Sequence, residues 1–99
     1  MSDGETRYEW DEAKNRRNIS KHGLAFSEAE GFGWDEAVEE IDPSDDDEVR
    51  WRAAAPLADG KIAILIYTQR ENRIRIISLR YAKRKEIRDY VEAKHEQGI

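Results

Sequence analysis

Cationic side chains gather in the last third of the chain, where their types suit phosphate binding. A guanidinium presents its N–H donors in a planar fork that matches the oxygens of phosphate or carboxylate. We expect these residues to line one basic, concave surface that holds an anion. For two of them, Arg73 and Arg80, a salt bridge to an acid such as Glu71 or Glu86 is the alternative. The cluster consists of Arg70, Arg73, Arg75, Arg80, Arg84 and Lys85.

Lys21 and His22 form a second candidate group, earlier in the chain. Histidine titrates near neutral pH, so it can take or give a proton in a reaction at physiological pH. Both residues fall in the last turn of an expected helix, where the helix dipole favours the protonated imidazole. A role in ending the helix is the alternative for His22. We set His95 aside because it lies in an expected frayed tail.

The sequence argues against several kinds of functional site and against a membrane or secreted location. The chain has no cysteine, so it has no disulfide, no thiolate zinc site and no cysteine nucleophile. No histidine and acid spacing suits a metal, and the acidic stretch 42–48 lacks the mid-loop glycine of an EF-hand. No apolar run approaches the roughly 20 residues of a membrane span, and residues 1–6 do not form a signal peptide. We therefore expect a cytoplasmic protein without metal, cofactor or membrane contact.

Charge is strongly segregated along the chain, although the net charge is only −5. Residues 28–48 contain eleven acidic and no basic side chains, whereas residues 49–99 contain twelve basic and six acidic ones. Such asymmetry indicates an interaction surface. Two alternatives stay open. The acidic run balances the basic face within one domain, or it binds a basic protein, and then reversing the charges at positions 45–47 should abolish that binding.

The elements that must position these residues begin with two expected helices. Asp11 is a suitable N-cap for the first, and Gly23 suits the left-handed residue that ends it. Ser27 to Glu30 matches a capping box, which predicts a second, short helix that ends near Gly33. The positions expected to be buried here are Trp10, Ala13, Ile19, Leu24 and Phe26.

A sheet and a third helix are expected to follow. The continuous apolar run from Ile62 to Tyr67 is typical of a strand buried on both faces. Short links predict an antiparallel sheet of three or four strands. The chain is therefore expected to form one α+β domain over residues 1–99, with flexible ends at 1–7 and 95–99. The expected strands are 37–41, 48–54, 61–68 and 73–81, and the last helix covers 83–96.

The last strand and helix would place the cations. Strict alternation puts Arg73 and Arg75 on one face of the strand and Arg80 on the other. The helix begins with three cations at positions 83–85 and lacks a Ser, Thr, Asp or Asn cap. Cations beside free backbone amides favour a bound phosphate. Solvated charges together with Glu86 are the alternative.

Two blocks of the chain resemble the BrnT family, the toxins of type II toxin–antitoxin modules. Together the blocks extend the resemblance from Tyr8 to about Tyr90. Residues 31–48 match the family's pattern least well. The first block is Tyr8-Glu9-Trp10-Asp11-Glu12-Ala13-Lys14-Asn15, Asn18, Lys21-His22-Gly23 and Phe26. The second is Arg73-Ile74-Arg75-Ile76-Ile77-Ser78, Arg80, Ala82 and Arg84-Lys85-Glu86.

The resemblance implies a fold similar to that of RelE-like ribonucleases and a metal-independent endoribonuclease that halts translation by cleaving RNA. It implies a BrnA-like antitoxin with a ribbon-helix-helix end. The toxin would contact operator DNA only through this antitoxin. His22 or Lys21 would then exchange protons, and Arg75 and Arg80 would stabilise the charged, pentavalent phosphate. A binding module without catalysis is the alternative, and it would bind RNA with a steep salt dependence and leave it uncut. The backbone phosphates of RNA would be bound by Arg70, Arg73, Arg84 and Lys85.

Overall fold

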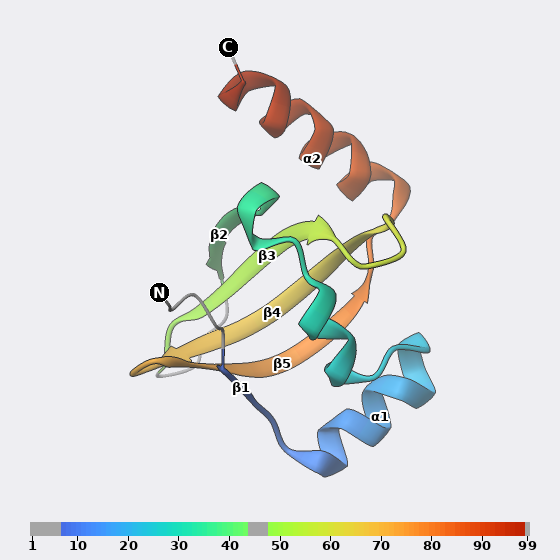
Figure 1. Cartoon of the computed structure of the whole chain (residues 1–99), viewed down its shortest axis with the longest axis vertical. Coiled ribbons are helices and arrows are strands. Elements are labelled where there is room, and N and C mark those ends of the chain that lie inside the picture. The colour runs from blue at the N-terminus through green and yellow to red at the C-terminus, as the bar shows by residue number, and fades with distance from the viewer. Residues whose placement is uncertain (1–6, 44–47, 99) are drawn as a thin grey trace.

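The computed structural model describes residues 7–43 and 48–98. They form one mixed, five-stranded sheet in the order β1-β5-β4-β3-β2, with two α-helices and two 3₁₀ helices (Figure 1). The expected α+β class and the C-terminal helix are confirmed. The elements are β1 (Arg7–Glu9), α1 (Glu12–His22), η1 (Phe26–Gly31), η2 (Trp34–Glu36), β2 (Val38–Asp42), β3 (Arg50–Pro56), β4 (Ile62–Arg70), β5 (Arg73–Tyr81) and α2 (Arg84–Gln97).

Helix α1 begins and ends where the sequence predicts. The Asp11 carboxylate accepts a hydrogen bond from the Lys14 N–H at 3.1 Å, which satisfies one of the free amides of the first turn. Gly23 adopts a φ of 75°, and its N–H donates to the Ile19 carbonyl at 2.8 Å. Because that backbone conformation favours glycine, the helix stops at His22 and holds this side chain at its end.

Polar side chains attach α1 to the rest of the fold. The Asn18 amide donates to the Leu79 carbonyl at 2.7 Å and accepts from the Leu79 N–H at 3.3 Å, so α1 lies against the edge of β5. The Asn15 carbonyl oxygen accepts from the Phe26 N–H at 2.8 Å, which fixes the start of η1. Both asparagines are buried, whereas Ile19, expected in the core, is 43% exposed.

Two features of the N-terminal third differ from the expectation. The segment after Ser27 forms 3₁₀ helices without side-chain caps rather than an α-helix. The buried residues of η1, Phe26 and Ala29, lie three apart, which is the repeat of a 3₁₀ helix. Strand β1 was not predicted, because three residues are too few to show alternation. It pairs with β5 in parallel, so the sheet is mixed and not purely antiparallel.

The two faces of the sheet pack against different helices. On one face, Leu65 and Ile76 pack with Phe26 of η1, and Figure 1 shows η1 crossing in front of β4 and β5. On the other face, Ile64 packs with Tyr90 of α2. Helix α2 covers only the end of that face, and its two other large apolar residues, Ile87 and Val91, are exposed. The exposed fractions are 40% for Ile87 and 58% for Val91.

A bulge interrupts β5 at Ile77. Adjacent residues of β4 pair with Ser78 and with Ile76, which leaves Ile77 without a partner in β4. One extra residue reverses the direction of the side chains beyond it. Arg80 therefore lies on the same face as Arg75, and its expected placement on the opposite face is wrong.

Several expectations fall partly outside the described residues. Residues 1–6 of the expected flexible N-terminus lie there, and Arg7 belongs to β1. The residues proposed for charge reversal, Asp45, Asp46 and Asp47, also lie outside. Helix α2 continues to Gln97, within the expected tail. No helix in the described part of the chain is long and apolar enough to cross a bilayer.

Candidate anion-binding and catalytic site

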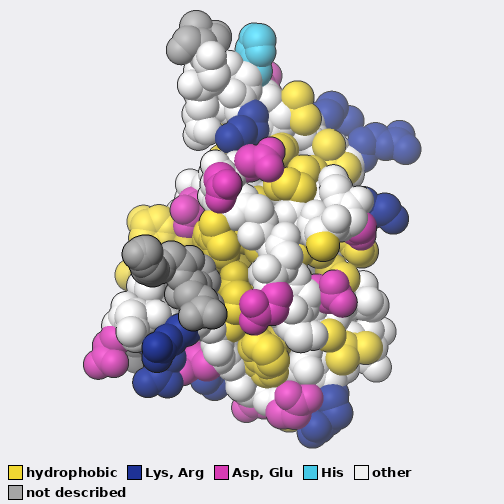
Figure 2. All heavy atoms as spheres, viewed as in Figure 1, with side chains coloured by type: hydrophobic (Ala, Val, Ile, Leu, Met, Phe, Trp, Pro, Cys, Tyr) yellow, Lys and Arg dark blue, Asp and Glu magenta, His cyan; other side chains and the backbone are white. Residues whose placement is uncertain are grey.

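Six arginines share the face of the sheet that α2 partly covers. The register places them there, because Ile64 and Ile66 pack on the α2 side and pair with Arg80 and Arg52. Figure 2 looks onto the opposite side, where hydrophobic and acidic side chains occupy the middle and Lys and Arg lie mainly toward the outline. We call the six-arginine surface the arginine face. It consists of Arg50 and Arg52 of β3, Arg70 of β4, and Arg73, Arg75 and Arg80 of β5.

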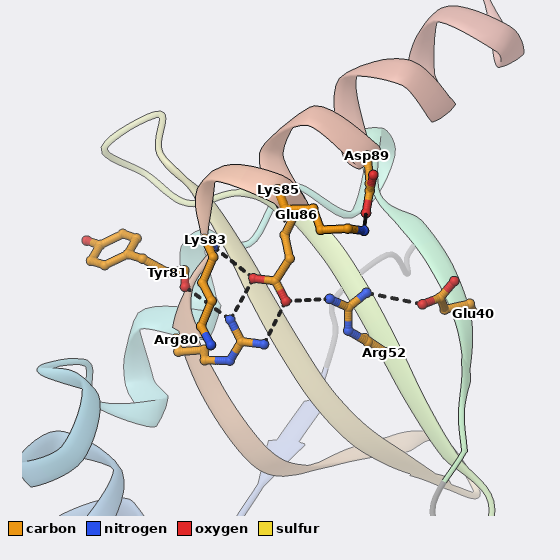
Figure 3. A network of polar contacts seen from close by, with 8 residues as sticks. All are labelled: Glu40, Arg52, Arg80, Tyr81, Lys83, Lys85, Glu86 and Asp89. Carbon is orange, nitrogen blue, oxygen red and sulfur yellow. Dashed lines mark hydrogen bonds and ion pairs between the residues drawn. The ribbon is translucent and has the colours of Figure 1, made fainter.

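Glu86 links the arginines at the α2 end of this face. Its carboxylate accepts from both Nη atoms of Arg80 at 2.8 Å and from Arg52 Nη2 at 2.7 Å (Figure 3). Arg52 also donates to Glu40 at 3.1 Å. The hydrogen bonds from Arg80 are the main reason that the pKa of Glu86 falls to about 2. The carboxylate is thus ionised at neutral pH and holds two guanidiniums in place.

The same carboxylate caps the start of α2. Glu86 Oε1 accepts from the Lys83 N–H at 2.8 Å, so the anion expected there is a side chain of the protein. Arg84 and Lys85 are exposed, and Lys85 donates to Asp89 at 3.0 Å, one turn further along the helix. The alternative interpretation, solvated cations together with Glu86, therefore describes this helix start.

Carboxylates also neutralise the arginines at the hairpin end, where β4 turns into β5. Arg70 donates through two nitrogens to the two oxygens of Glu48, both at 2.9 Å. Glu9 of β1 accepts from Arg73 at 3.1 Å and from Arg75 at 3.5 Å. The side chains of Arg70 and Arg73 are 49% and 54% exposed. Because ion pairs in solvent are weak, a phosphate can displace these carboxylates at little cost.

An open cleft separates the end of α1 from β5. A second hollow continues the cleft along α1 and shares three of its lining residues. The ammonium groups of Lys21 and Lys83 form no ion pair with any described residue, so both are free to meet an anion. We call this the His22 cleft. It is lined by Lys21, His22, Ser78, Arg80, Tyr81 and Lys83.

His22 is set up to accept a proton. Burial is the first cause that lowers its pKa, and the positive charges of Lys21 and Arg80 lower it further. This direction is opposite to the expected effect of the helix dipole, because partial burial and two cations outweigh it. The imidazole is therefore neutral at pH 7, as a general base must be.

The structure brings three of the four predicted catalytic residues together. Lys21, His22 and Arg80 line the His22 cleft, whereas Arg75 lies further along β5, beyond the bulge. Among the described residues, no group of three or more His, Asp or Glu is placed to hold a metal ion. The predicted phosphate-binding residues lie in two places, Arg70 and Arg73 at the hairpin end and Arg84 and Lys85 at the start of α2.

Sequence reasoning did not place Arg50 and Arg52 in the site. The signal was present, since both alternate with Trp51 and Ala53 of the core and so belong to the polar face of β3. Thr68 was also missed. It pairs with Arg75 on the same face, and its hydroxyl is the one buried polar side-chain atom without a hydrogen-bond partner among the described residues.

Two comparisons with known proteins cover this site. A family model described as "Ribonuclease toxin, BrnT, of type II toxin-antitoxin system" matches residues 10–86, from Trp10 to Glu86. A crystal structure of the Brucella abortus ribonuclease toxin BrnT, determined at 1.1 Å resolution, is similar with a TM-score of 0.61 and 29% identity. That match covers 81% of this chain and 100% of the Brucella chain. A search of curated proteins finds no match.

Proposed function

Because this chain belongs to the BrnT family of ribonuclease toxins of type II toxin–antitoxin systems, we propose that it cleaves RNA in the His22 cleft. The proposal rests above all on one observation. The imidazole of His22, whose pKa is lowered, and the guanidinium held by Glu86 line the same open cleft, together with two ammonium groups that form no ion pair with any described residue.

The proposed reaction is an attack of a ribose 2′-oxygen on the neighbouring phosphorus. The O2′–P bond forms and the P–O5′ bond breaks, which leaves a 2′,3′-cyclic phosphate and a 5′-hydroxyl. His22 takes the proton from the 2′-hydroxyl, and the Lys21 ammonium gives a proton to the departing 5′-oxygen. Side chains thus handle every proton, and we expect cleavage to continue without a divalent metal ion.

Arg80 would stabilise the negative charge that develops on the pentavalent phosphate. Its guanidinium is held by two hydrogen bonds to Glu86, so it does not need to reorganise during the reaction. Such preorganised charge is usually the largest single contribution to catalysis. The Lys83 ammonium lies in the same cleft and supplies a second cation for the phosphate oxygens.

The rest of the arginine face would hold the RNA backbone beyond the cut. Arg75, Arg73 and Arg70 follow one another from the bulge toward the hairpin end. Phosphates of the RNA would replace the carboxylates of Glu9 and Glu48 on these guanidiniums. Binding of this kind recognises charge rather than sequence, and it weakens as salt is raised.

A type II module also supplies a protein antitoxin. We propose that the partner is BrnA-like, that it neutralises the toxin, and that the complex reaches operator DNA only through the antitoxin's ribbon-helix-helix end. Cleavage of RNA would arrest translation in a cell that lacks this partner. Arrest of growth should therefore accompany fragmentation of RNA, and co-expression of the antitoxin should relieve both.

The test is cleavage of a single-stranded RNA by the purified protein in EDTA, compared with His22→Gln. We expect the wild type to leave 2′,3′-cyclic phosphate ends and the variant to be at least about 100-fold slower, since general-base catalysis contributes roughly that factor. The lowered pKa of His22 places the acid limb of the wild-type pH–rate profile below pH 6.5. The variant should lack this limb.

His95→Gln is the matched control, because His95 is the other histidine and lies exposed on α2. It should cleave at the wild-type rate. A wild-type protein that binds RNA with a steep salt dependence but never cuts it would contradict the proposal and indicate a binding module. Equal rates for wild type and His22→Gln would remove His22 from the mechanism.

A further inference from the structure

A small pocket lies on the other side of Glu86 from the His22 cleft. It opens between α2 and strands β2 and β3 and has a volume of about 150 Å³. Its floor is apolar and includes Ala54, Ile64 and Tyr90. Three carboxylates, those of Glu40, Glu86 and Asp89, and the guanidinium of Arg52 also line it. Of the residues that line it, the functions proposed above involve only Glu86, which holds Arg80, and Arg52, which belongs to the arginine face.

The volume suits one aromatic ring. An engineered protein cavity of about 150 Å³ is large enough to hold benzene. A nucleobase entering by its Watson–Crick edge places its six-membered ring first, and the flat faces of that ring suit apolar walls. Bases of single-stranded RNA are free to leave the stack and enter such pockets.

Two carboxylates of the pocket, those of Glu40 and Asp89, each keep one oxygen that no described residue occupies, and Arg52 keeps N–H donors beyond the two it uses. Both oxygens of Glu86 already accept from Arg80, and Arg52 donates to Glu40 and Glu86. Glu40 binds Arg52 through Oε2, and Asp89 binds Lys85 through Oδ2. Within the described residues, the hydrogen bonds of these two acids leave Glu40 Oε1 and Asp89 Oδ1 able to accept.

We propose that this pocket binds a guanine base of the RNA, with the Glu40 and Asp89 carboxylates accepting from its N1–H and its exocyclic amine. Guanine carries both a ring N–H and an amino group on its Watson–Crick edge. Adenine and cytosine present an amino group beside ring acceptors, and uracil presents one N–H between two carbonyls. Only guanine offers two adjacent donor groups to the two free carboxylate oxygens of the pocket.

This inference rests on the proposed function, and it adds base selection to it. Glu86 touches Arg52 at the pocket and Arg80 at the His22 cleft, so a base in the pocket belongs to a nucleotide next to the cut phosphate. The ribonuclease would therefore select its cleavage positions through one guanine, while the arginine face holds the backbone without regard to sequence.

Binding is tested with 2′-deoxynucleotides, which lack the attacking hydroxyl and cannot be cleaved. We expect dGMP to shift the NMR signals of Tyr90 and of the Ala54 methyl group. Deoxyinosine monophosphate, which lacks the amino group, and dAMP should each bind about tenfold more weakly. That factor corresponds to the loss of one hydrogen bond to a charged acceptor. Glu40→Ala and Asp89→Ala should remove the preference for dGMP.

Glu92→Ala is the matched control, an exposed acid on α2 that does not line the pocket. It should keep the preference for dGMP. Equal binding of dGMP and dAMP would overturn the inference. Tighter binding of N-acetyl-lysinamide than of dGMP, lost in Asp89→Ala, would also overturn it and would make the pocket a site for a basic side chain of a protein partner.

Cleavage gives a second measurement. Sequencing of the RNA fragments should show guanine at one fixed position beside the cut, and replacing it with inosine should slow cleavage about tenfold. Cuts without a preferred base would overturn this inference alone. Selective binding of dGMP by a protein that never cleaves RNA would overturn the proposed function and leave the guanine pocket standing.

Discussion

At the α2 end of the arginine face, Arg80 and Arg52 share the carboxylate of Glu86, and their side chains are 25% and 26% exposed. At the hairpin end, the side chains of Arg70 and Arg73 are 49% and 54% exposed, about twice as much. The paired groups are the same, but their surroundings differ. A shielded pair fixes a guanidinium in one place, as catalysis requires, whereas an exposed pair opens easily for a ligand. Burial therefore separates the two proposed roles more than residue type does.

Arg80→Ala should show the difference between the two ends of the arginine face most strongly. We expect the rate of RNA cleavage to fall about 100-fold or more, the usual loss when one preorganised donor is removed from a transition state. Arg70→Ala at the hairpin end should raise KM a few-fold and leave kcat nearly unchanged. Single-turnover and steady-state kinetics on the same RNA separate the two effects. Equal losses in the two variants would contradict a division of the arginine face into two ends.

Glu86→Gln and Glu48→Gln should show the same difference between the two ends in the free energy of unfolding. The first variant leaves Arg80 without its counter-ion, leaves Arg52 with Glu40 alone and weakens the cap of α2. We expect a loss of about 1–2 kcal/mol in the free energy of unfolding. Glu48→Gln should cause no measurable change, because Glu48 and Arg70 lie in solvent. Urea denaturation at pH 7 measures both. A larger loss in Glu48→Gln than in Glu86→Gln would contradict the comparison.

The pH dependence of stability should test the role of Glu86 at the α2 end more sharply. The folded protein lowers the pKa of Glu86 from 4.5 to about 2, so ionised Glu86 stabilises the fold fully above pH 4.5. This stabilisation should disappear as the pH falls toward 2. The difference between wild type and Glu86→Gln should thus be constant from pH 7 to 5 and shrink below pH 4.5. Urea midpoints between pH 6 and 2.5 test it, and a difference that grows on acidification would show the sign to be wrong.

The smallest expected effect is in the salt dependence of RNA binding. Arg73→Ala should reduce the slope of log affinity against log salt concentration by about 0.7, the value for one phosphate contact on a single strand. Fluorescence anisotropy with a 2′-O-methyl RNA, which cannot be cleaved, measures the slope. Arg88→Ala, an exposed arginine of α2 outside the arginine face, should keep the wild-type slope. An unchanged slope in Arg73→Ala would remove the hairpin end from the RNA-binding surface.

Elements whose limits are set by neighbouring residues could be predicted from the sequence. Asp11 and Gly23 gave the limits of α1, and the apolar run from Ile62 predicted the central strand β4. The short β1 could not be predicted, since its three residues pair with β5, more than 60 positions away. Three residues of the cleft, Lys21, His22 and Arg80, were predicted from their types and from the resemblance.

The organisation of the site depends on one residue that no pattern revealed. The bulge at Ile77 brings Arg80 onto the face of Arg75, and strict alternation had placed them apart. The partners of these arginines were also hard to predict, because Glu9 and Glu86 come from opposite ends of the chain. A salt bridge between Arg80 and Glu86 was one of the open alternatives, and the structure contains it together with the cleft.

The hydrogen bonds between Asn18 and Leu79 also protect one point of the sheet edge. A strand edge with free N–H and C=O groups is a template on which another chain can add a strand and begin aggregation. Strand β1 covers β5 only at residues 73–75, and beyond them the amide of Asn18 satisfies both backbone groups of Leu79. The Asn18 side chain thus occupies the edge of β5 at Leu79, where a sixth strand would have blocked the His22 cleft. At Leu79 the edge therefore has no free backbone group on which another strand could pair.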